Sequence, residues 1–199
     1  MSPRRDPYFG RYALTVITAA VVVVILGLTA IWYFFEAGGA TSPTSPLRDL
    51  LGKARGLAPN QAMLYYTRDG RQLVGTVTNL GRAETSPGER AQQIVQRLIA
   101  GHDSAFLKSP VPRGTQVKSV FVNDTIAIVN LSKEFIDRMG PSVDDELLAV
   151  FSIVNSLLYN IETIEAVQIL VEGERVPTAR GTVDLESPLI ANAALNRPA

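Results

Sequence analysis

The 199-residue chain contains no cysteine and a single histidine, His102. Without cysteine it can form no disulfide, present no thiol nucleophile and carry no lipid on an N-terminal cysteine. Its folded part must therefore be stabilised by packing alone. The chain also lacks a charge excess, because 19 basic side chains balance 19 acidic ones. A balanced charge provides no electrostatic footprint for nucleic acid, so we expect no nucleic-acid partner.

One long segment, residues 13–35, holds no charged side chain at all. As a helix, residues 13–34 would rise about 33 Å, enough to cross a hydrocarbon core of about 30 Å. The segment ends in Trp32, Tyr33 and two phenylalanines rather than in a small-residue cleavage site. This ending favours an uncleaved transmembrane anchor over a signal peptide. The alternative, a buried helix of a soluble core, rarely runs this far without a polar break.

The charges around this segment predict its orientation. Three arginines precede it, and the first charge after it is Glu36. Positive residues stay on the cytoplasmic side, so residues 1–12 are predicted to be cytoplasmic and everything after residue 35 extracytoplasmic. The chain is thus predicted to be a single-pass protein of a bacterial inner (cytoplasmic) membrane that contacts the lipid bilayer through residues 13–35. The residues expected at the two membrane interfaces are Arg4, Arg5, Arg11, Trp32 and Tyr33.

A linker is predicted at residues 36–60, where "EAGGATSPTSP" is typical of a flexible tether. Its second half, "SPLRDLLGKARG", predicts a short amphipathic helix that begins after Ser45 and ends at Gly56. A helix this short is marginal alone and must dock somewhere. Its own domain, the membrane surface and a partner all remain open as docking sites.

The folded domain is predicted at residues 61–190, followed by a flexible tail at 191–199. Two hairpins are indicated, "AMLYYT" with "QLVGTVTNL" around an Asp-Gly turn, and "QVKSVFV" with "TIAIVNL" around an Asn-Asp turn. One helix is expected to begin after Ser86, and a longer, more buried one after Ser142. The run "EAVQILVEG" predicts a central strand, and "GTVDLESPL" an additional edge strand.

This order of elements predicts an α+β fold, a two-layer sandwich of a mainly antiparallel sheet with two main helices on one face. Alternation along the last strand points Val167, Ile169 and Val171 toward the helices. The opposite sheet face is then open, and an open face of mixed polarity commonly binds a partner. The candidate partner-binding residues on that face are Thr76, Thr78, Gln168, Leu170 and Glu172.

Four segments in this order, "IVNLSKEF", "FSIVNSLL", "VQILVEGE" and "GTVDLESPL", resemble the GerMN domain, a sporulation and spore-germination family. The resemblance covers roughly residues 62–189. It implies a membrane-tethered extracytoplasmic domain, a fold similar to ring-building motifs and a non-enzymatic role in an envelope assembly. The sporulation member of the family is held by a lipidated cysteine, whereas this chain would use a transmembrane helix.

We expect no catalytic site, metal site or cofactor. His102, Asp103 and Ser104 are adjacent in sequence, but triad partners converge from separate segments, so a polar loop is the better interpretation. Asp144, Asp145 and Glu146 suit the first turn of a helix without any metal. Asn155, within an apolar helix, either marks a binding pocket or is a core asparagine bonded to nearby backbone.

The sequence therefore predicts an anchored module that binds other envelope proteins, copies of itself, or both. The alternative is a module that binds cell-wall glycan or a small molecule between helices and sheet. Because sugar sites usually expose aromatic rings, that alternative depends on the tyrosines of the domain, which are Tyr65, Tyr66 and Tyr159.

Overall fold

The computed structural model of the protein describes residues 56–83 and 86–197. The expected cytoplasmic segment at 1–12, the anchor at 13–35 and most of the linker, including its amphipathic helix, lie outside the described residues. Within the described ranges, no helix is long and apolar enough to cross a membrane. The described residues all belong to one compact unit of the chain, Gly52–Ala199.

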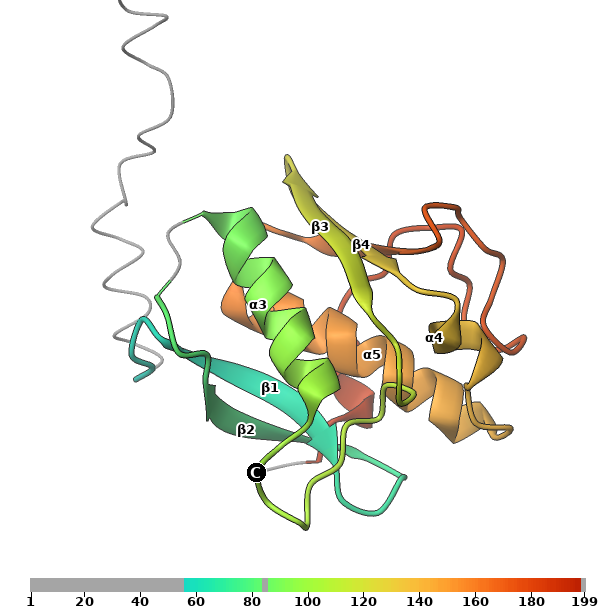
Figure 1. Cartoon of the computed structure of the whole chain (residues 1–199), viewed down its shortest axis with the longest axis horizontal. Coiled ribbons are helices and arrows are strands. Elements are labelled where there is room, and N and C mark those ends of the chain that lie inside the picture. The colour runs from blue at the N-terminus through green and yellow to red at the C-terminus, as the bar shows by residue number, and fades with distance from the viewer. Residues whose placement is uncertain (1–55, 84–85, 198–199) are drawn as a thin grey trace, which may run out of the picture. The chain divides into compact units, whose positions relative to one another are not determined.

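Strand pairs and helices alternate along this unit (Figure 1). In chain order the elements are β1 (Gln61–Thr67), β2 (Leu73–Asn79), α3 (Pro87–Ala100), β3 (Val117–Asn123), β4 (Ile126–Leu131), α4 (Glu134–Asp137), α5 (Val143–Asn160), β5 (Ala166–Val171) and η1 (Ala193–Leu195). Both predicted hairpins, both main helices and the predicted last strand are present, with ends within a few residues of those expected.

The strands form two sheets rather than the single sheet predicted from the sequence. β1 and β2 pair as an antiparallel hairpin. The second sheet has the order β3-β4-β5, with β3 antiparallel and β5 parallel to β4. The α+β class and the mainly antiparallel pairing are confirmed, but the single-sheet layout is wrong.

Helix α5 is the physical reason for two sheets, because its side chains occupy the edge of β1 that would otherwise extend the sheet. The Asn160 side chain accepts a hydrogen bond from Met63 N at 2.9 Å and donates one to Met63 O at 2.7 Å. Ser156 Oγ accepts from Tyr65 N at 3.0 Å. Backbone groups that are already bonded to a helix cannot pair with a further strand.

Helix α3 forms where its capping residues predict. Ser86 Oγ accepts from Glu89 N at 3.1 Å and donates to the Glu89 carboxylate at 2.9 Å. Gly101, which follows the helix, has a φ of 91°, a conformation that L side chains rarely adopt. The buried stripe faces β1 and β3 and consists of Ala91, Ile94, Val95 and Leu98.

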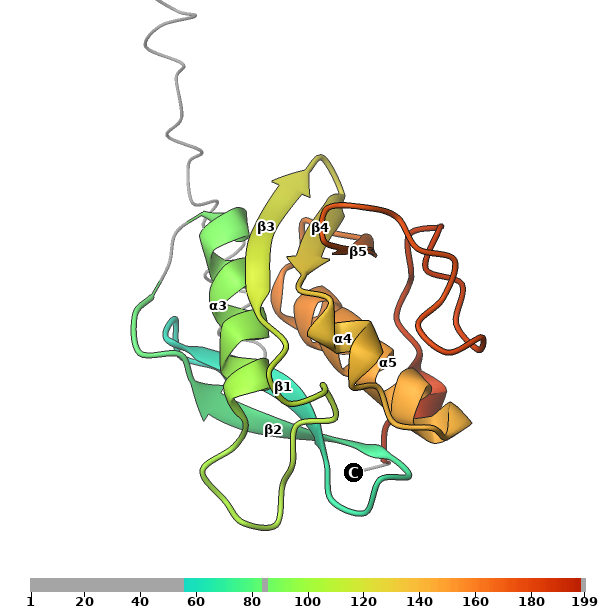
Figure 2. The same cartoon turned by 45° about the vertical axis from the view of Figure 1, so that its right-hand side comes forward.

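Helix α5 lies at the centre of the unit, as its many apolar positions predict. A capping box joins Ser142 and Asp145 at its start, with Ser142 Oγ accepting from Asp145 N and the Asp145 carboxylate accepting from Ser142 N. Every residue from Leu148 to Leu157 is buried. The helix contacts β1, α3 and β5, so it links the two sheets through one continuous core (Figure 2).

The chain after β5 folds back over the domain without forming the edge strand predicted at 181–189. Within residues 181–189 only Leu189 pairs with β5, through two backbone bonds of 2.8 Å with Val167. The rest of the segment is held by side chains instead, including Gln168, whose Nε2 donates to Leu185 O at 2.7 Å. Val183 and Leu185 are buried in the core, so their alternation reflects packing rather than strand pairing.

Residues 191–197, part of the expected tail, are hydrogen-bonded to helix α5. The Asn155 side chain donates to Asn192 O and to Asn196 Oδ1 at 3.0 Å each, and accepts from Asn192 N at 3.0 Å. Asn155 is 4% exposed. The interpretation of Asn155 as a core residue that anchors nearby chain is confirmed.

Candidate functional site

The outer face of the three-stranded sheet, opposite the core, holds three of the predicted partner-binding residues. Val167, Ile169 and Val171 are buried, so the predicted direction of β5 is confirmed. On the other side of β5, Leu170 is half-buried and Glu172 is exposed. Gln168 is only 3% exposed, because it reaches over the strand edge to the carbonyls of Ile169 and Leu185. Its side chain is thus already engaged within the domain.

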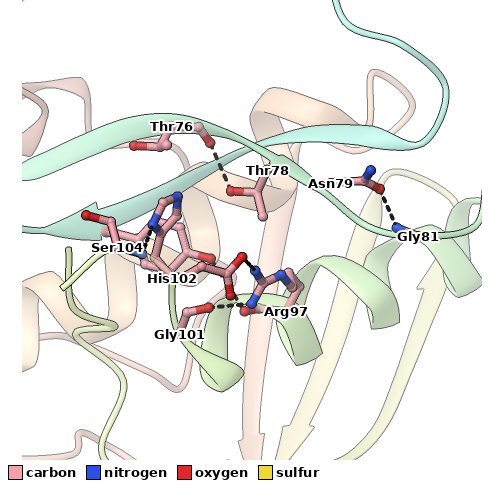
Figure 3. Close-up of polar contacts among 10 residues, drawn as sticks. Thr76, Thr78, Asn79, Gly81, Arg97, Gly101, His102 and Ser104 are labelled. Atoms are coloured by element: carbon pink, nitrogen blue, oxygen red, sulfur yellow. Dashed lines mark hydrogen bonds and ion pairs between the residues drawn. The ribbon is translucent and has the colours of Figure 1, made fainter. Parts of the chain in front are cut away.

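The other two predicted residues, Thr76 and Thr78, do not join this face. They belong to β2, which lies in the other sheet. Thr78 is only 5% exposed, and its hydroxyl donates to Thr76 O at 3.4 Å (Figure 3). The expectation of one shared face is therefore wrong, because it assumed that both hairpins contribute to a single sheet.

An apolar patch that the sequence analysis did not single out lies on the outer face of the three-stranded sheet. Its centre is Phe121 on β3, which is 62% exposed. Phe121 lies directly opposite Ile128 on β4, and the neighbouring cross-strand pair is Asn130 with Leu170. The outer apolar patch is defined here as Phe121, Ile126, Ile128 and Leu170, of which the last three are half-buried.

Polar and charged groups border this patch at one end. Lys118 Nζ lies 3.0 Å from the Glu172 carboxylate, and that carboxylate also accepts from Lys133 N at 2.9 Å. These hydrogen bonds, the one from Lys118 first, lower the pKa of Glu172. Asn130 Oδ1 accepts from Gly173 N at 2.8 Å. An exposed apolar centre with a fixed polar border is the usual anatomy of a protein–protein contact.

The acidic cluster at the start of α5 has a structural role centred on Glu146. This carboxylate is fully buried and accepts bonds from the Thr178 hydroxyl at 2.7 Å, from Ala179 N and Arg180 N at 3.0 Å, and from Thr182 N at 2.9 Å. Burial acts to raise the pKa of Glu146, but these hydrogen bonds outweigh it and lower the pKa to about 2. An ionised Glu146 therefore fastens residues 178–183 to α5.

The three residues considered as a triad occupy a loop after α3, where Figure 3 labels His102 and Ser104. Asp103 pairs with Arg97 at 2.9 Å instead of with His102. His102 Nδ1 accepts from Ser104 N at 2.9 Å, and Ser104 Oγ accepts from Phe106 N at 3.3 Å. No side-chain relay runs from the Ser104 hydroxyl through His102 to Asp103 among these described residues, so they do not form the arrangement of a catalytic triad.

His102 contributes to packing, since its ring meets that of Tyr66 edge-on with centroids 5.2 Å apart. Tyr66 is fully buried, and burial raises the pKa of its hydroxyl. Across residues 56–83 and 86–197, no three histidine, cysteine or acidic side chains come together as metal ligands.

The remaining tyrosines give little support to a sugar platform. Tyr65 and Tyr159 are both half-buried, and their rings meet edge-on with centroids 6.2 Å apart. Neither tyrosine is fully exposed, whereas sugar sites usually expose aromatic rings. The exposed aromatic rings of the described part are Phe106 and Phe121 instead.

The outer apolar patch could have been found from the sequence by comparing the two strands of the second hairpin. In "VKSVFVN" the inward residues are Val120 and Val122, which leaves Phe121 on the outward side. A large aromatic residue at an outward position of a strand is the signal that was available.

Comparisons with known proteins give a family match and matches to solved structures. The model of the Germane family, described as sporulation and spore germination, matches residues 63–177. No curated protein matches the chain.

Among solved structures, a protein of Clostridium perfringens described as a candidate lipoprotein is 25% identical, with a TM-score of 0.50 over 69% of this chain and 92% of that one. The first GerMN domain of the sporulation protein GerM from Bacillus subtilis is 20% identical, with a TM-score of 0.54 over 66% of this chain and 96% of that domain. The tandem GerMN domains of the same protein give the same identity and TM-score, and this chain spans 45% of their length. At 20% identity the GerM structures show a shared fold.

Proposed function

Because this chain belongs to the Germane family of sporulation and spore germination domains, we propose that it is a membrane-tethered module that binds another protein of the cell envelope. The resemblance inferred from the sequence is confirmed at the level of the family. The module would act on the extracytoplasmic side of a bacterial inner membrane, and its contribution would be binding rather than catalysis.

The proposed tether is the uncharged segment at 13–35, preceded by three arginines. The similar protein of Clostridium perfringens is described as a candidate lipoprotein, which supports membrane attachment as a property that proteins of this fold can have. This chain has no cysteine to carry a lipid, so a transmembrane helix is the route that its sequence offers.

The observation that carries the binding proposal is the outer apolar patch. A phenylalanine that is 62% exposed lies among half-buried aliphatic side chains on adjacent strands. A charged pair borders them. Aromatic side chains surrounded by polar groups commonly form the centres of protein interfaces. The expected partner therefore offers an apolar pocket or surface to Phe121, with polar groups around it.

The test uses the full-length chain in its native membrane, cross-linked with and without the substitution Phe121→Arg. A charge placed in a contact that excludes water should remove the cross-linked partner, while the exposed site leaves folding intact. Phe106→Arg is the matched control, because Phe106 is 75% exposed on a loop away from the patch. Loss of the partner in Phe121→Arg alone supports the proposal. Unchanged cross-linking in both variants would refute a binding role for the outer apolar patch.

A further inference from the structure

Exposed strand edges are where β-proteins pair with other chains, and most edges of this domain are closed from within. The outward groups of β1 are bonded to α5 at Met63 and Tyr65, and at Thr67 to Lys108 through backbone bonds of 2.8 and 2.9 Å. The edge of β1 away from β2 is thus bonded along its length.

The second sheet is closed on both sides as well. On β5, Val167 bonds to Leu189, Val171 bonds to Glu174, and Ile169 O accepts from Gln168 Nε2 at 3.1 Å. On the opposite side, helix α3 runs alongside β3 in both views (Figures 1 and 2). One edge of this sheet is thus hydrogen-bonded and the other is covered by a helix, so neither is freely exposed.

The outer edge of β2 differs from all of these. Because Met63 and Tyr65 point their backbone groups toward α5, the alternate residues of β1 carry the bonds to β2. Their partners in the register are Val74, Thr76 and Thr78, so the backbone groups of the intervening β2 residues point outward. The first of these, Leu73 O, accepts from Arg197 N at 2.7 Å, which shows that this edge takes an added chain.

Beyond Leu73, the outward N–H and C=O groups of Gly75 and Val77 have no hydrogen-bond partner among residues 56–83 and 86–197. Both residues are exposed, and Val77 is 45% exposed. The strand LVGTVTN carries no charge and no proline, the two devices with which edge strands commonly discourage pairing. The open edge of β2 is therefore competent to accept another strand.

We propose that a second copy of this chain pairs with the open edge of β2, strand against strand and antiparallel, about a twofold axis at Thr76. This register joins Gly75 of each copy to Val77 of the other through their outward backbone groups. In this register Leu73 lies opposite Asn79 of the other copy, so the new pairing is confined to residues 75–77 and ends where Asn196 and Arg197 already pair with Leu73. The pairing would convert two separate hairpins into one four-stranded sheet.

Two features of the edge favour a second copy as the occupant. The strand has no charge, so identical strands meet without repulsion. In addition, the side chains of Met63 and Tyr65 lean over Gly75, where a Cβ atom would lie 3.0 Å from Met63 Sδ. In the proposed register, Val77 of one copy lies beside Met63 and Tyr65 of the other copy. The exposed Val77 would then be buried twice, once in each half of the contact.

This pairing is independent of the outer apolar patch, which lies on the other sheet, and it adds a self-association surface to the proposed binding module. Phe121→Arg should therefore leave the pairing intact. Failure of the partner-binding proposal and failure of the self-pairing proposal are thus separately observable.

The absence of cysteine makes a direct test possible in the full-length chain. In the proposed register the two Thr76 residues form a non-hydrogen-bonded pair with Cα atoms about 4.5 Å apart, within disulfide range. Thr76→Cys should thus give a disulfide-linked dimer on mild oxidation in membranes. Asn79→Cys is the matched control, because Asn79 is exposed on the same strand but would lie about 20 Å from its counterpart.

A second substitution, Val77→Lys in the Thr76→Cys chain, should abolish the dimer by placing two charges at the centre of the contact. Circular dichroism checks that this variant is folded. If it is not, the comparison of Thr76→Cys with Asn79→Cys decides alone. No dimer from Thr76→Cys, or equal dimer from both cysteine variants, would overturn the proposal. A Thr76→Cys adduct with a different protein would also overturn it, in favour of a strand supplied by that protein.

Discussion

The side-chain amide of Asn160 pairs with the backbone of Met63 in the way that a neighbouring strand would, accepting from its N–H at 2.9 Å and donating to its carbonyl at 2.7 Å. The two residues are 97 positions apart in the chain. One amide at the end of α5 thus replaces a missing strand and fixes the helix against β1.

Replacing Asn160 by alanine should destabilise the domain by about 1–3 kcal/mol, because two partly buried backbone groups lose their partner. Urea unfolding of residues 52–199, followed by circular dichroism, measures this change. Asn123→Ala, at the exposed end of β3, is the control and should change stability by less than about 0.5 kcal/mol. Equal stabilities of the two variants would mean that solvent replaces the Asn160 amide without cost.

Glu146 should make the domain sensitive to acid. Its pKa is about 2 in the folded state and 4.5 as a free side chain, so ionisation favours folding above pH 4.5. As the pH falls from 4.5 toward 2, the unfolded chain takes up the proton first, and about 3 kcal/mol of stability is lost. Unfolding free energies measured across this pH range should show the decline.

The substitution Glu146→Gln should remove most of this pH dependence and lower stability at neutral pH by about 3 kcal/mol, because a neutral amide accepts the clustered N–H bonds poorly. Asp144→Asn removes one negative charge from an exposed neighbour and should leave the loss of stability between pH 4.5 and 2 unchanged. If the unfolding free energy fell equally steeply with pH in the wild type and in Glu146→Gln, the structural role of the ionised Glu146 would be contradicted.

Phe151 tests the central position of α5. The substitution Phe151→Ala should cost about 3–5 kcal/mol, because the side chain is only 9% exposed and its removal leaves a cavity. Val143→Ala, at a position that is 57% exposed on the same helix, should be nearly neutral. Thermal unfolding of both variants makes the comparison, and a Phe151→Ala midpoint equal to that of Val143→Ala would contradict the packing described.

Gly140 lies where a side chain would collide with the capping box of α5. A Cβ atom there would strike the Asp145 carboxylate, which accepts the bond from Ser142 N. Gly140→Ala should therefore lower stability by about 1 kcal/mol or more through loss of the cap. Gly88→Ala is the matched control, since nothing lies within 4 Å of its Cβ position and alanine favours the helix it occupies. Chemical unfolding should show that Gly88→Ala is more stable than Gly140→Ala.

The local elements could be predicted from the sequence because each carries its own signals. Ser86 and Ser142 cap the two helices as their positions indicate, and Asp124, with a φ of 50°, occupies the turn between β3 and β4. These features depend on neighbouring residues, so no distant contact can reverse them.

The division into two sheets could not be predicted from such signals, because the choice is made by contacts across the chain. Ser156 and Asn160, four positions apart on α5, present polar groups on one face of the helix. That spacing was the available clue that the helix bonds to a strand edge. Gln168 is a similar case, since its alternation points outward but the later segment at 183–185 covers it.

The pairing of Asn160 with Met63 also has a consequence for the newly made chain. The strand AMLYYT has no charge, and its outer edge is closed only after α5, nearly a hundred residues later, has been synthesised and docked. Until then, a hairpin whose two strands carry no charge is exposed on both edges, a condition that favours aggregation of growing chains. We therefore expect substitutions that slow the docking of α5 to reduce the yield of folded protein more than its final stability.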